Sequence, residues 1–213
     1  MYLIAALMLT QSVDAIVSKA IAARGGMKRI KSLNSQRLSG RISLAGGTGA
    51  FIVEMKRPGM ARETVTIGDK SMIRITDGVL GWVVGSLRNL NEPQQLSPEE
   101  LHNLNADLEG PLVDYKAKGN RIELIGKEKI GKRKAYKLVI SMKNGDNRID
   151  FIDAKSYLEL EWKGLTFESY FRDYREVKGL MYPFEIDSGS QKIMLDKVEV
   201  NPKLDDARFQ KPQ

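Results

Sequence analysis

"EMKRPGMARETV", residues 54 to 65, contains two alternating runs that meet at a Lys-Arg-Pro-Gly corner. Before the corner, Phe51, Val53 and Met55 fall on one face of an extended segment, and residues 60–67 alternate in the same way after it. A hydrophobic period of two is typical of a β-strand whose two faces meet different surroundings. The stretch therefore predicts an antiparallel hairpin that turns on paired cations, Lys56 and Arg57.

The same period, broken by glycine-rich turns, continues through most of the chain. Strands are predicted at residues 36–44, 50–57, 60–67, 71–76, 80–84, 121–125, 135–142, 148–152, 157–162, 166–174, 180–188 and 191–200. Asn144-Gly145 is the strongest hairpin signal among the turns. A sheet of this many strands must curl to bury its apolar face and to protect its edges. We therefore predict a mainly β (α+β) fold, in which a curved antiparallel sheet of about 11–12 strands forms an incomplete barrel.

Two helices are predicted to cover the open side of this sheet. The first runs from Val13 to Arg24, where apolar residues recur with the i, i+3, i+4, i+7 spacing and Gly25-Gly26 ends the pattern; a short helical turn follows at residues 27–31. The second lies mid-chain, because Ser97-Pro98-Glu99-Glu100 has the pattern of a capping box and Leu101, Leu104 and Leu108 continue a helical stripe to about Glu109. The interval from 85 to 110 shows no strand pattern.

Residues 13–213 are predicted to form a single domain, since no linker or repeat interrupts the pattern. Residues 1–12, MYLIAALMLTQS, have an apolar centre followed by small and polar residues, which is typical of part of a secretory signal peptide. The alternative is a buried N-terminal helical turn. If the segment is a signal, the mature chain begins near residues 11–13 and works in the cell envelope.

The chain has 213 residues and a formal net charge of +7, which favours anionic partners. Basic and acidic residues alternate along most of the chain, however, as in Lys127-Glu128-Lys129, so a mixed, solvated surface is the preferred interpretation. No RNA-binding signature or basic helix is present, and we expect no nucleic-acid partner. Cysteine is absent, which removes disulfides, thiolate metal sites and a thiol nucleophile.

The sequence offers little catalytic equipment. His102 is the one histidine, so no cluster of histidine metal ligands can form, and residues 126–133 have the glycine spacing of a P-loop but place Arg133 where Ser or Thr is needed. Paired carboxylates occur at Glu99-Glu100, Asp205-Asp206 and Glu159 with Glu161, and caps, turns and an outer strand face explain them better than a glycosidase does. We predict no enzyme activity, no metal and no cofactor, with an unrecognised hydrolase as the disfavoured alternative.

Several short motifs together resemble one family. They are Lys56-Arg57-Pro58 at a strand end, TDGVLGW at residues 76–82, GPLVDY at 110–115, LMYPF at 180–184 and LDDARF at 204–209. The chain after Ser12 thereby resembles the LolA-like family of periplasmic carriers that sort lipoproteins to the outer membrane. Each motif is short, and the likeness spans most of the chain.

The resemblance implies an incomplete barrel closed by helices, with an apolar cavity that shields acyl chains from water. It implies a soluble, monomeric periplasmic carrier for lipoproteins or other lipids, served by an inner-membrane release complex and an outer-membrane acceptor. It also implies that Arg57, beside Lys56 at the rim, hydrogen-bonds the covering helices and keeps the lid shut; an ordinary cationic corner is the alternative. The family has an aromatic residue where Ala61 stands here, so a lipid or another amphiphile stays open as the cargo.

Apolar residues of the alternating strands, and methionines that can adapt to irregular cargo, are the candidates for the cavity wall. They are Ile42, Leu44, Phe51, Val53, Met55, Val65, Trp82, Phe167 and Phe171, with Met60, Met72, Met181 and Met194. Burying an acyl chain yields about 0.8 kcal/mol per methylene, so binding needs apolar area and no catalyst. The alternative is that the same residues fill a packed core, and the protein is then a non-catalytic envelope binding or scaffold module.

Overall fold

One antiparallel sheet runs through the computed structural model, which describes residues 11–104, 107–164 and 168–212. Its strands are β1 (Ser35–Leu44), β2 (Gly47–Lys56), β3 (Met60–Ile67), β4 (Lys70–Thr76), β5 (Gly81–Gly85), β6 (Leu90–Gln95), β7 (Arg121–Ile130), β8 (Arg133–Ser141), β9 (Asn147–Asp153), β10 (Glu159–Lys163), β11 (Glu168–Val177), β12 (Leu180–Asp187) and β13 (Gln191–Val200). The helices are α1 (Val13–Arg24), α2 (Met27–Lys31) and α3 (Pro98–Leu104), with short 3-10 turns η1 (Ser86–Arg88) and η2 (Asp206–Phe209).

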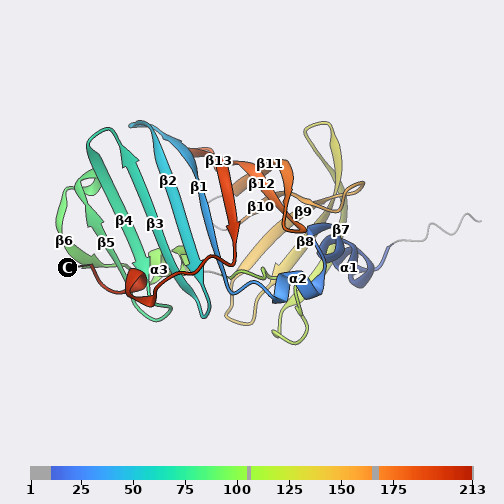
Figure 1. Cartoon of the computed structure of the whole chain (residues 1–213). Coiled ribbons are helices and arrows are strands. Elements are labelled where there is room, and N and C mark those ends of the chain that lie inside the picture. Colours follow the sequence, from blue (N-terminus) through green and yellow to red (C-terminus); the bar gives the residue numbers. More distant parts are fainter. Residues whose placement is uncertain (1–10, 105–106, 165–167, 213) are drawn as a thin grey trace, which may run out of the picture.

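The strand order is β6-β5-β4-β3-β2-β1-β13-β12-β11-β10-β9-β8-β7. Strands that are consecutive in sequence therefore pair everywhere except at β6 and β7, and β1 pairs with β13 from the far end of the chain. The sheet is not closed, because β6 and β7 are its two edges (Figure 1). The chain must therefore cross from one edge to the other between these two strands. Residues 107–120, which follow α3, make this crossing and are called the covering linker here. The predicted curved, incomplete antiparallel barrel is confirmed, with thirteen strands in the described part of the chain.

The strand that the sequence pattern missed is β6. Its sequence, LNEPQQ, contains a proline and little apolar alternation. It pairs with β5 alone, through Trp82 opposite Gln95 and Val83 opposite Gln94. An edge strand can carry proline and polar side chains because one row of its backbone groups meets solvent. The signal that defines an inner strand is therefore absent from this one.

The N-terminal helix begins and ends where the sequence predicts. Ser12 caps α1 by accepting a hydrogen bond from the Ala15 amide at 3.2 Å. Gly25, which follows the last turn, has φ 129°, and a Cβ atom there would lie 2.3 Å from the carbonyl oxygen of Gly179. Only glycine allows this close approach between the end of α1 and the β11–β12 turn.

The mid-chain helix has the predicted capping box and is shorter than predicted. The Glu100 amide donates to Ser97 Oγ at 3.2 Å, and the Ser97 amide donates to Glu100 Oε2 at 3.1 Å. Its last residue is Leu104, whereas the stripe predicted a helix to Glu109. The Asp107 carboxylate instead accepts from the Glu109 amide at 3.0 Å. Aspartate can replace helical hydrogen bonds in this way, which favours a turn.

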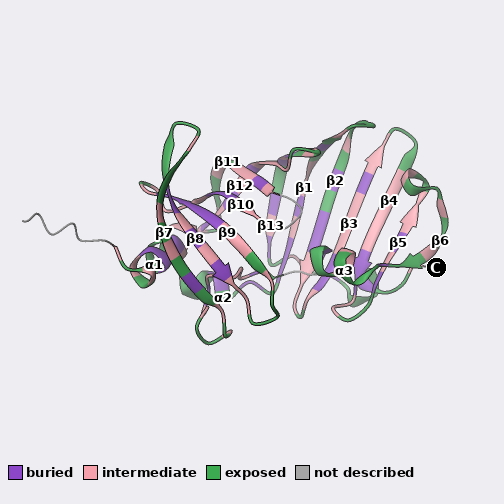
Figure 2. Cartoon of the chain, turned by 180° about the vertical axis from the view of Figure 1, so that it is seen from behind, coloured by how far each residue is buried: buried purple, intermediate pink, exposed green. Residues whose placement is uncertain are grey.

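The two faces of the sheet are covered by different segments. On the concave face, α3 packs on β3–β5 through Ala61, Val83, Leu96 and Leu104, while α1 packs on β8 and β9 through a cluster that contains Ile16 and Leu138. On the convex face, the C-terminal residues Leu204 and Phe209 cover Met60 and Ile75. Figure 2 shows the buried stripes along these strands. Among the described residues, no helix combines the length and apolarity that a membrane crossing requires.

The contact between α1 and the sheet predicts a large stability effect. Leu138 on β8 is fully buried in the cluster that α1 covers. We expect Leu138→Ala to lower the free energy of unfolding by about 2–5 kcal/mol, because it leaves a cavity as well as removing apolar contacts. The measurement is urea denaturation followed by circular dichroism. Ile125→Ala on the adjacent β7 is the control, since Ile125 is 57% exposed, and equal effects of the two substitutions would contradict the described packing.

Candidate functional site

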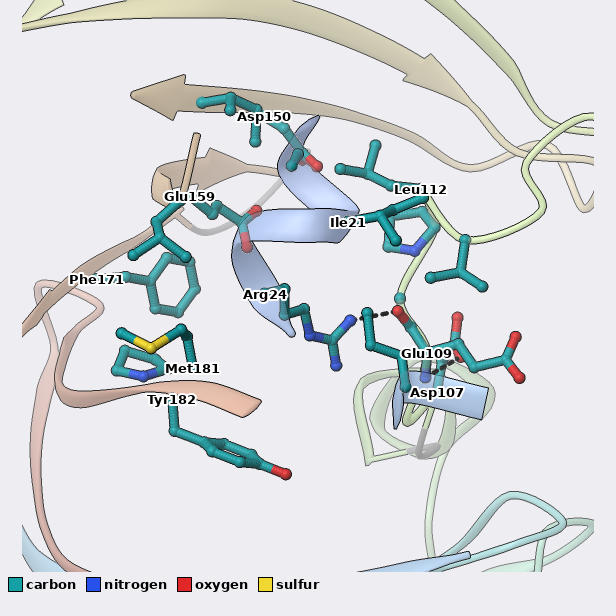
Figure 3. A pocket seen from close by; sticks show the side chains of 18 of the residues that line it. Ile21, Arg24, Asp107, Glu109, Leu112, Asp150, Glu159, Phe171, Met181 and Tyr182 are labelled. Atoms are coloured by element: carbon teal, nitrogen blue, oxygen red, sulfur yellow. Dashed lines mark hydrogen bonds between the residues drawn. The ribbon is translucent and has the colours of Figure 1, made fainter. Parts of the chain in front are cut away.

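A cavity of about 300 Å³ lies between the concave face of the sheet and the segments that cover it (Figure 3). Its wall is drawn from α1, α2, the covering linker and six strands, β1, β2 and β9–β12. The apolar part of the wall includes Ile21, Ile30, Met55, Leu108, Leu112, Phe171 and Met181. The charged part comprises Arg24, Asp107, Glu109, Arg148, Asp150 and Glu159. The cavity is thus amphipathic, which the sequence did not predict.

Two arginines hold the covering linker over the cavity. Arg24 at the end of α1 donates hydrogen bonds to the carbonyl oxygens of Glu109 and Leu108, the second at 2.8 Å (Figure 3). Arg57 at the β2–β3 corner donates from Nη2 to Glu109 Oε1 at 2.8 Å and from Nε to the Leu33 carbonyl oxygen at 2.6 Å. Hydrogen bonds that involve a charged group contribute about 1.5–3 kcal/mol each. The linker is therefore fastened to both α1 and the sheet.

Lys56, the other predicted rim cation, has a different partner from its neighbour. Its ammonium group donates to the Leu204 carbonyl oxygen at 2.8 Å and forms an ion pair with Asp206. Both belong to the C-terminal segment, which covers the convex face. Lys56 is the last residue of β2, and Arg57 already belongs to the corner. Successive side chains along a strand point to opposite faces, so these two neighbours reach different partners.

One end of the cavity holds a cluster of charged side chains from β9 and β10, of which Asp150 is buried and Arg148 and Glu159 are half-buried. Arg148 donates from Nε to Asp150 at 2.5 Å and from Nη2 to Glu159 at 2.6 Å, and its guanidinium lies 4.9 Å from the ring centroid of Trp162. The Asp150 side chain is 1% exposed and that of Glu159 is 27% exposed. Tyr174 on β11 donates its hydroxyl to the Glu159 carbonyl oxygen at 2.8 Å.

Burial controls how these groups titrate. Burial and the neighbouring Asp150 charge raise the pKa of Glu159 to about 7, although Arg148 and Arg24 act in the opposite direction. Burial also raises the pKa of Asp150, against the effect of Arg148. Burial raises the pKa of the Tyr174 hydroxyl well above its ordinary value, so it stays a hydrogen-bond donor. A carboxyl group that faces the cavity thus changes its charge near neutral pH.

An open groove of about 510 Å³ lies beside the cavity, between α1 and the covering linker. It is lined by residues of α1, Gly26, Met27 and residues 112 and 114–117. Ile21 and Leu112 line both the groove and the cavity. These two side chains therefore form the partition between the buried space and an opening at the surface.

The structure places the predicted cavity residues in several surroundings. Met55, Phe171 and Met181 line the cavity. Ile42, Phe51, Val53 and Val65 are buried in the main core cluster, against which Leu44 and Met72 pack. Met60 contacts the C-terminal segment on the convex face, and Trp82 pairs across the strands with Ile75 of the same cluster. Met194, opposite Arg41, is not among the lining residues, and Phe167 lies outside the described residues.

Sequence reasoning missed the charged end of the cavity. It placed Glu159 and Glu161 together on an outer strand face, but the register shifts between them, so that Glu159 pairs with Ile152 and Glu161 with Phe151. The two carboxylates consequently point to opposite faces of the sheet. Arg148 and Asp150 alternate with Ile149 and Phe151, and such a strand shows no obvious inner face. His102 is exposed on α3 and its Nε2 lies 3.1 Å from Asp146 in the β8–β9 turn.

No group of three or more potential metal-ligating His, Cys, Asp or Glu side chains occurs among the described residues. A scan against protein-family models finds no match to the sequence, and a search of curated proteins finds none either. Solved structures do match. A DUF1329 family protein from Desulfovibrio piger is 15% identical, with a TM-score of 0.60 over 94% of this chain and 98% of that one. A LolA superfamily protein from Nitrosomonas europaea is 12% identical, with a TM-score of 0.58 over 95% of this chain and 99% of that one. The chain has a LolA-like fold.

The hydrogen bonds to the covering linker predict how fast its backbone amides exchange with solvent. We expect Arg24→Met and Arg57→Leu each to speed hydrogen exchange of amides in residues 107–113 by about tenfold, because each removes charged hydrogen bonds from that segment. Exchange in β1–β3 is expected to stay unchanged. Arg29→Met is the control, since within the described part of the chain the Arg29 guanidinium donates to the Gly25 carbonyl oxygen, next to its own helix, and not to the linker. Exchange in the linker that is equal in all four proteins would show that the arginines do not fasten it.

The raised pKa of Glu159 predicts a pH-dependent stability. Its folded-state pKa of about 7 exceeds the ordinary value of 4.5. The stability that the proton contributes is therefore complete below about pH 4.5 and is lost as the pH rises through 7. We expect the free energy of unfolding to fall by up to about 3 kcal/mol between these values, and Glu159→Gln to reduce this slope. Urea denaturation across the range measures it. Glu123→Gln, at an exposed position on β7, should leave the slope intact; an unchanged slope in Glu159→Gln would reject the assignment.

Proposed function

We propose that this LolA-like protein is a non-catalytic carrier that binds the hydrocarbon part of a lipid or a lipoprotein in its cavity. It works in the periplasm and takes this cargo to the outer membrane, receiving it from a release complex at the inner membrane and delivering it to an acceptor. The fold supports the carrier class. The observation that carries the proposal is a hollow beneath a segment fastened by side-chain hydrogen bonds, beside which an open groove runs to the surface.

The wall of the cavity suits an amphiphile better than a pure hydrocarbon. Apolar side chains from α1, β2 and β12, such as Ile21, Met55 and Met181, can contact an acyl chain. The cluster of Arg148, Asp150 and Glu159 offers charged and hydrogen-bonding groups at the other end. The polar end of the ligand, whether an ester, an amide or a headgroup, is proposed to lie against this cluster.

Cavity size sets what binds without rearrangement. About 300 Å³ is at the lower end of small-molecule sites, which span about 300–1,000 Å³. A single short chain fits this space. A longer chain requires the partition of Ile21 and Leu112 to part, which joins the cavity to the groove outside it. Release of the linker by Arg24 and Arg57 is the proposed opening step.

The second candidate is a binding or scaffold module that uses its outer surface and has a packed core. The observation in its favour is that the half of the sheet around Phe51, Val53 and Val65 is filled by its own side chains. This candidate predicts no saturable site for a hydrophobic probe. The carrier and the packed module therefore predict different results in one measurement, the titration of the protein with a hydrophobic probe.

The test is a fluorescence titration with a dansyl-labelled fatty acid. We expect saturable binding by the wild-type protein and affinity at least about tenfold lower in Met181→Trp, because the larger side chain occupies the cavity. Met194→Trp is the matched control, since Met194 lies on the neighbouring strand and does not line the cavity. Melting temperatures establish that both variants fold. Absence of saturation, or equal affinity in the two variants, would favour the packed module.

The cargo itself is best identified by mass spectrometry of the lipids and lipoproteins that co-purify with the protein from its native envelope. Acylated lipoprotein in the complex supports the sorting role, and free phospholipid supports a lipid carrier. Either result agrees with occupation of the cavity. Recovery of neither, from a protein that saturates with the fatty acid, would contradict the envelope carrier.

A further inference from the structure

The hairpin of β7 and β8 projects beyond the rest of the sheet (Figures 1 and 2). β9 ends its pairing with Asp153 opposite Ala135, while β7 and β8 continue to Ile130 opposite Arg133. The last contacts on the β9 side are made by the Ala154 amide, which donates to the Lys134 carbonyl oxygen at 2.8 Å, and by Asp153, which pairs with Arg133, so the backbone of residues 129–132 extends past the end of β9. Residues 127–129 and 131–134 are exposed.

Lysines gather on one face of this hairpin. Lys129 and Lys134 are direct partners across the two strands, and Lys127 faces Tyr136 on the same side two residues away. Like charges directly opposite each other destabilise a strand pair. No ion pair joins Lys127, Lys129 or Lys134 to a carboxylate among the described residues. The nearby acids have other partners, since Glu128 pairs with Lys137 and Asp153 with Arg133.

The positive face continues toward α1 over a pair of tyrosines. The rings of Tyr136 and Tyr157 stack with their centroids 6.0 Å apart. Lys127 Nζ lies 4.7 Å from the Tyr136 centroid, and Lys19 Nζ on α1 lies 5.0 Å from that of Tyr157. Tyrosine with a lysine beside it is typical of the boundary between apolar and aqueous phases. Tyr157 also lines the cavity, so this surface adjoins the candidate site.

We propose that Lys19, Lys127, Lys129 and Lys134, called the basic face, dock the protein on a membrane surface that contains anionic lipid. The negative headgroups take the place of the missing carboxylates and relieve the repulsion between Lys129 and Lys134. Tyr136 is buried beneath this surface, whereas Tyr157 is half-buried and lines the cavity. An aromatic side chain between the lysines and an apolar cavity favours a membrane over a nucleic acid as the partner. The inference goes beyond the proposed function and does not depend on it, because these charges act whether or not the cavity takes cargo.

The test is co-sedimentation of the full chain with phosphatidylcholine vesicles that contain roughly 30% phosphatidylglycerol. The triple variant Lys127→Gln, Lys129→Gln, Lys134→Gln is expected to bind on the order of 100-fold more weakly, since each lysine near an anionic surface contributes about fivefold. Wild-type binding is expected to be lost in about 0.5 M NaCl and on pure phosphatidylcholine.

The matched control is the triple variant Lys28→Gln, Lys70→Gln, Lys203→Gln, at three other exposed lysines. Both triple variants lower the formal net charge of +7 by the same amount and keep residues 1–10. The control is expected to bind vesicles like the wild type. An equal loss of vesicle binding in the two triple variants would show that net charge alone causes the effect, and it would overturn the proposal. Tighter binding of the basic face to single-stranded RNA than to anionic vesicles would also overturn it. Met181→Trp is expected to keep vesicle binding, so a failure of docking and a failure of cargo binding are distinguishable.

Discussion

The hydrogen bonds from Arg24 and Arg57 to the covering linker hold the site together. The chain completes β1 and the five strands on one side of it, and must then reach the opposite edge of the sheet before it can return to β13. The connection runs over the concave face as irregular backbone, whose polar groups need partners wherever water is excluded. Arginine supplies several donors in a fixed fork, so one side chain satisfies two carbonyl oxygens of the linker. The same bonds that satisfy these backbone groups hold the linker over the cavity.

The concave face is divided into a filled half and a hollow half for a physical reason. Around β1–β3 the inward residues are aliphatic or aromatic and pack against α2 and the linker. Near β9 and β10 the inward positions carry Arg148, Asp150 and Glu159, which keep their charge and hydrogen bonds only if polar groups or solvent remain within reach. A buried ion cluster cannot be covered by apolar side chains without a large desolvation penalty. The hollow beside the cluster agrees with that limit.

Charge is distributed unevenly over a protein whose net charge is +7. Half of the lysines and arginines have a carboxylate close by, as with Arg74 and Glu63 or Lys192 and Glu185. Those pairs that lie at the surface contribute little to stability. The hairpin tip differs because its lysines face each other. The alternation of basic and acidic residues along the sequence does not predict this clustering of lysines, because strand register, and not sequence order, decides which side chains are neighbours. This basic surface lies beside the cavity, because Lys19 contacts the ring of Tyr157 and Tyr157 lines the cavity.

The sequence by itself determined the local elements: the span of α1, the capping box of α3, the inner strands and the curved, incomplete barrel. Periodicity, caps and turn residues encode these features over a few neighbouring residues. Only the tertiary structure decided which part of the concave face borders the cavity and which part is filled by side chains. Four features depend on partners far along the chain. They are the register shift near Glu159, the polar edge strand β6, the early end of α3 and the position of Met60 on the convex face. The Lys56-Arg57 corner illustrates both levels, because the sequence located the turn, while the fold sent one cation to the C-terminal segment and the other to the cover of the cavity.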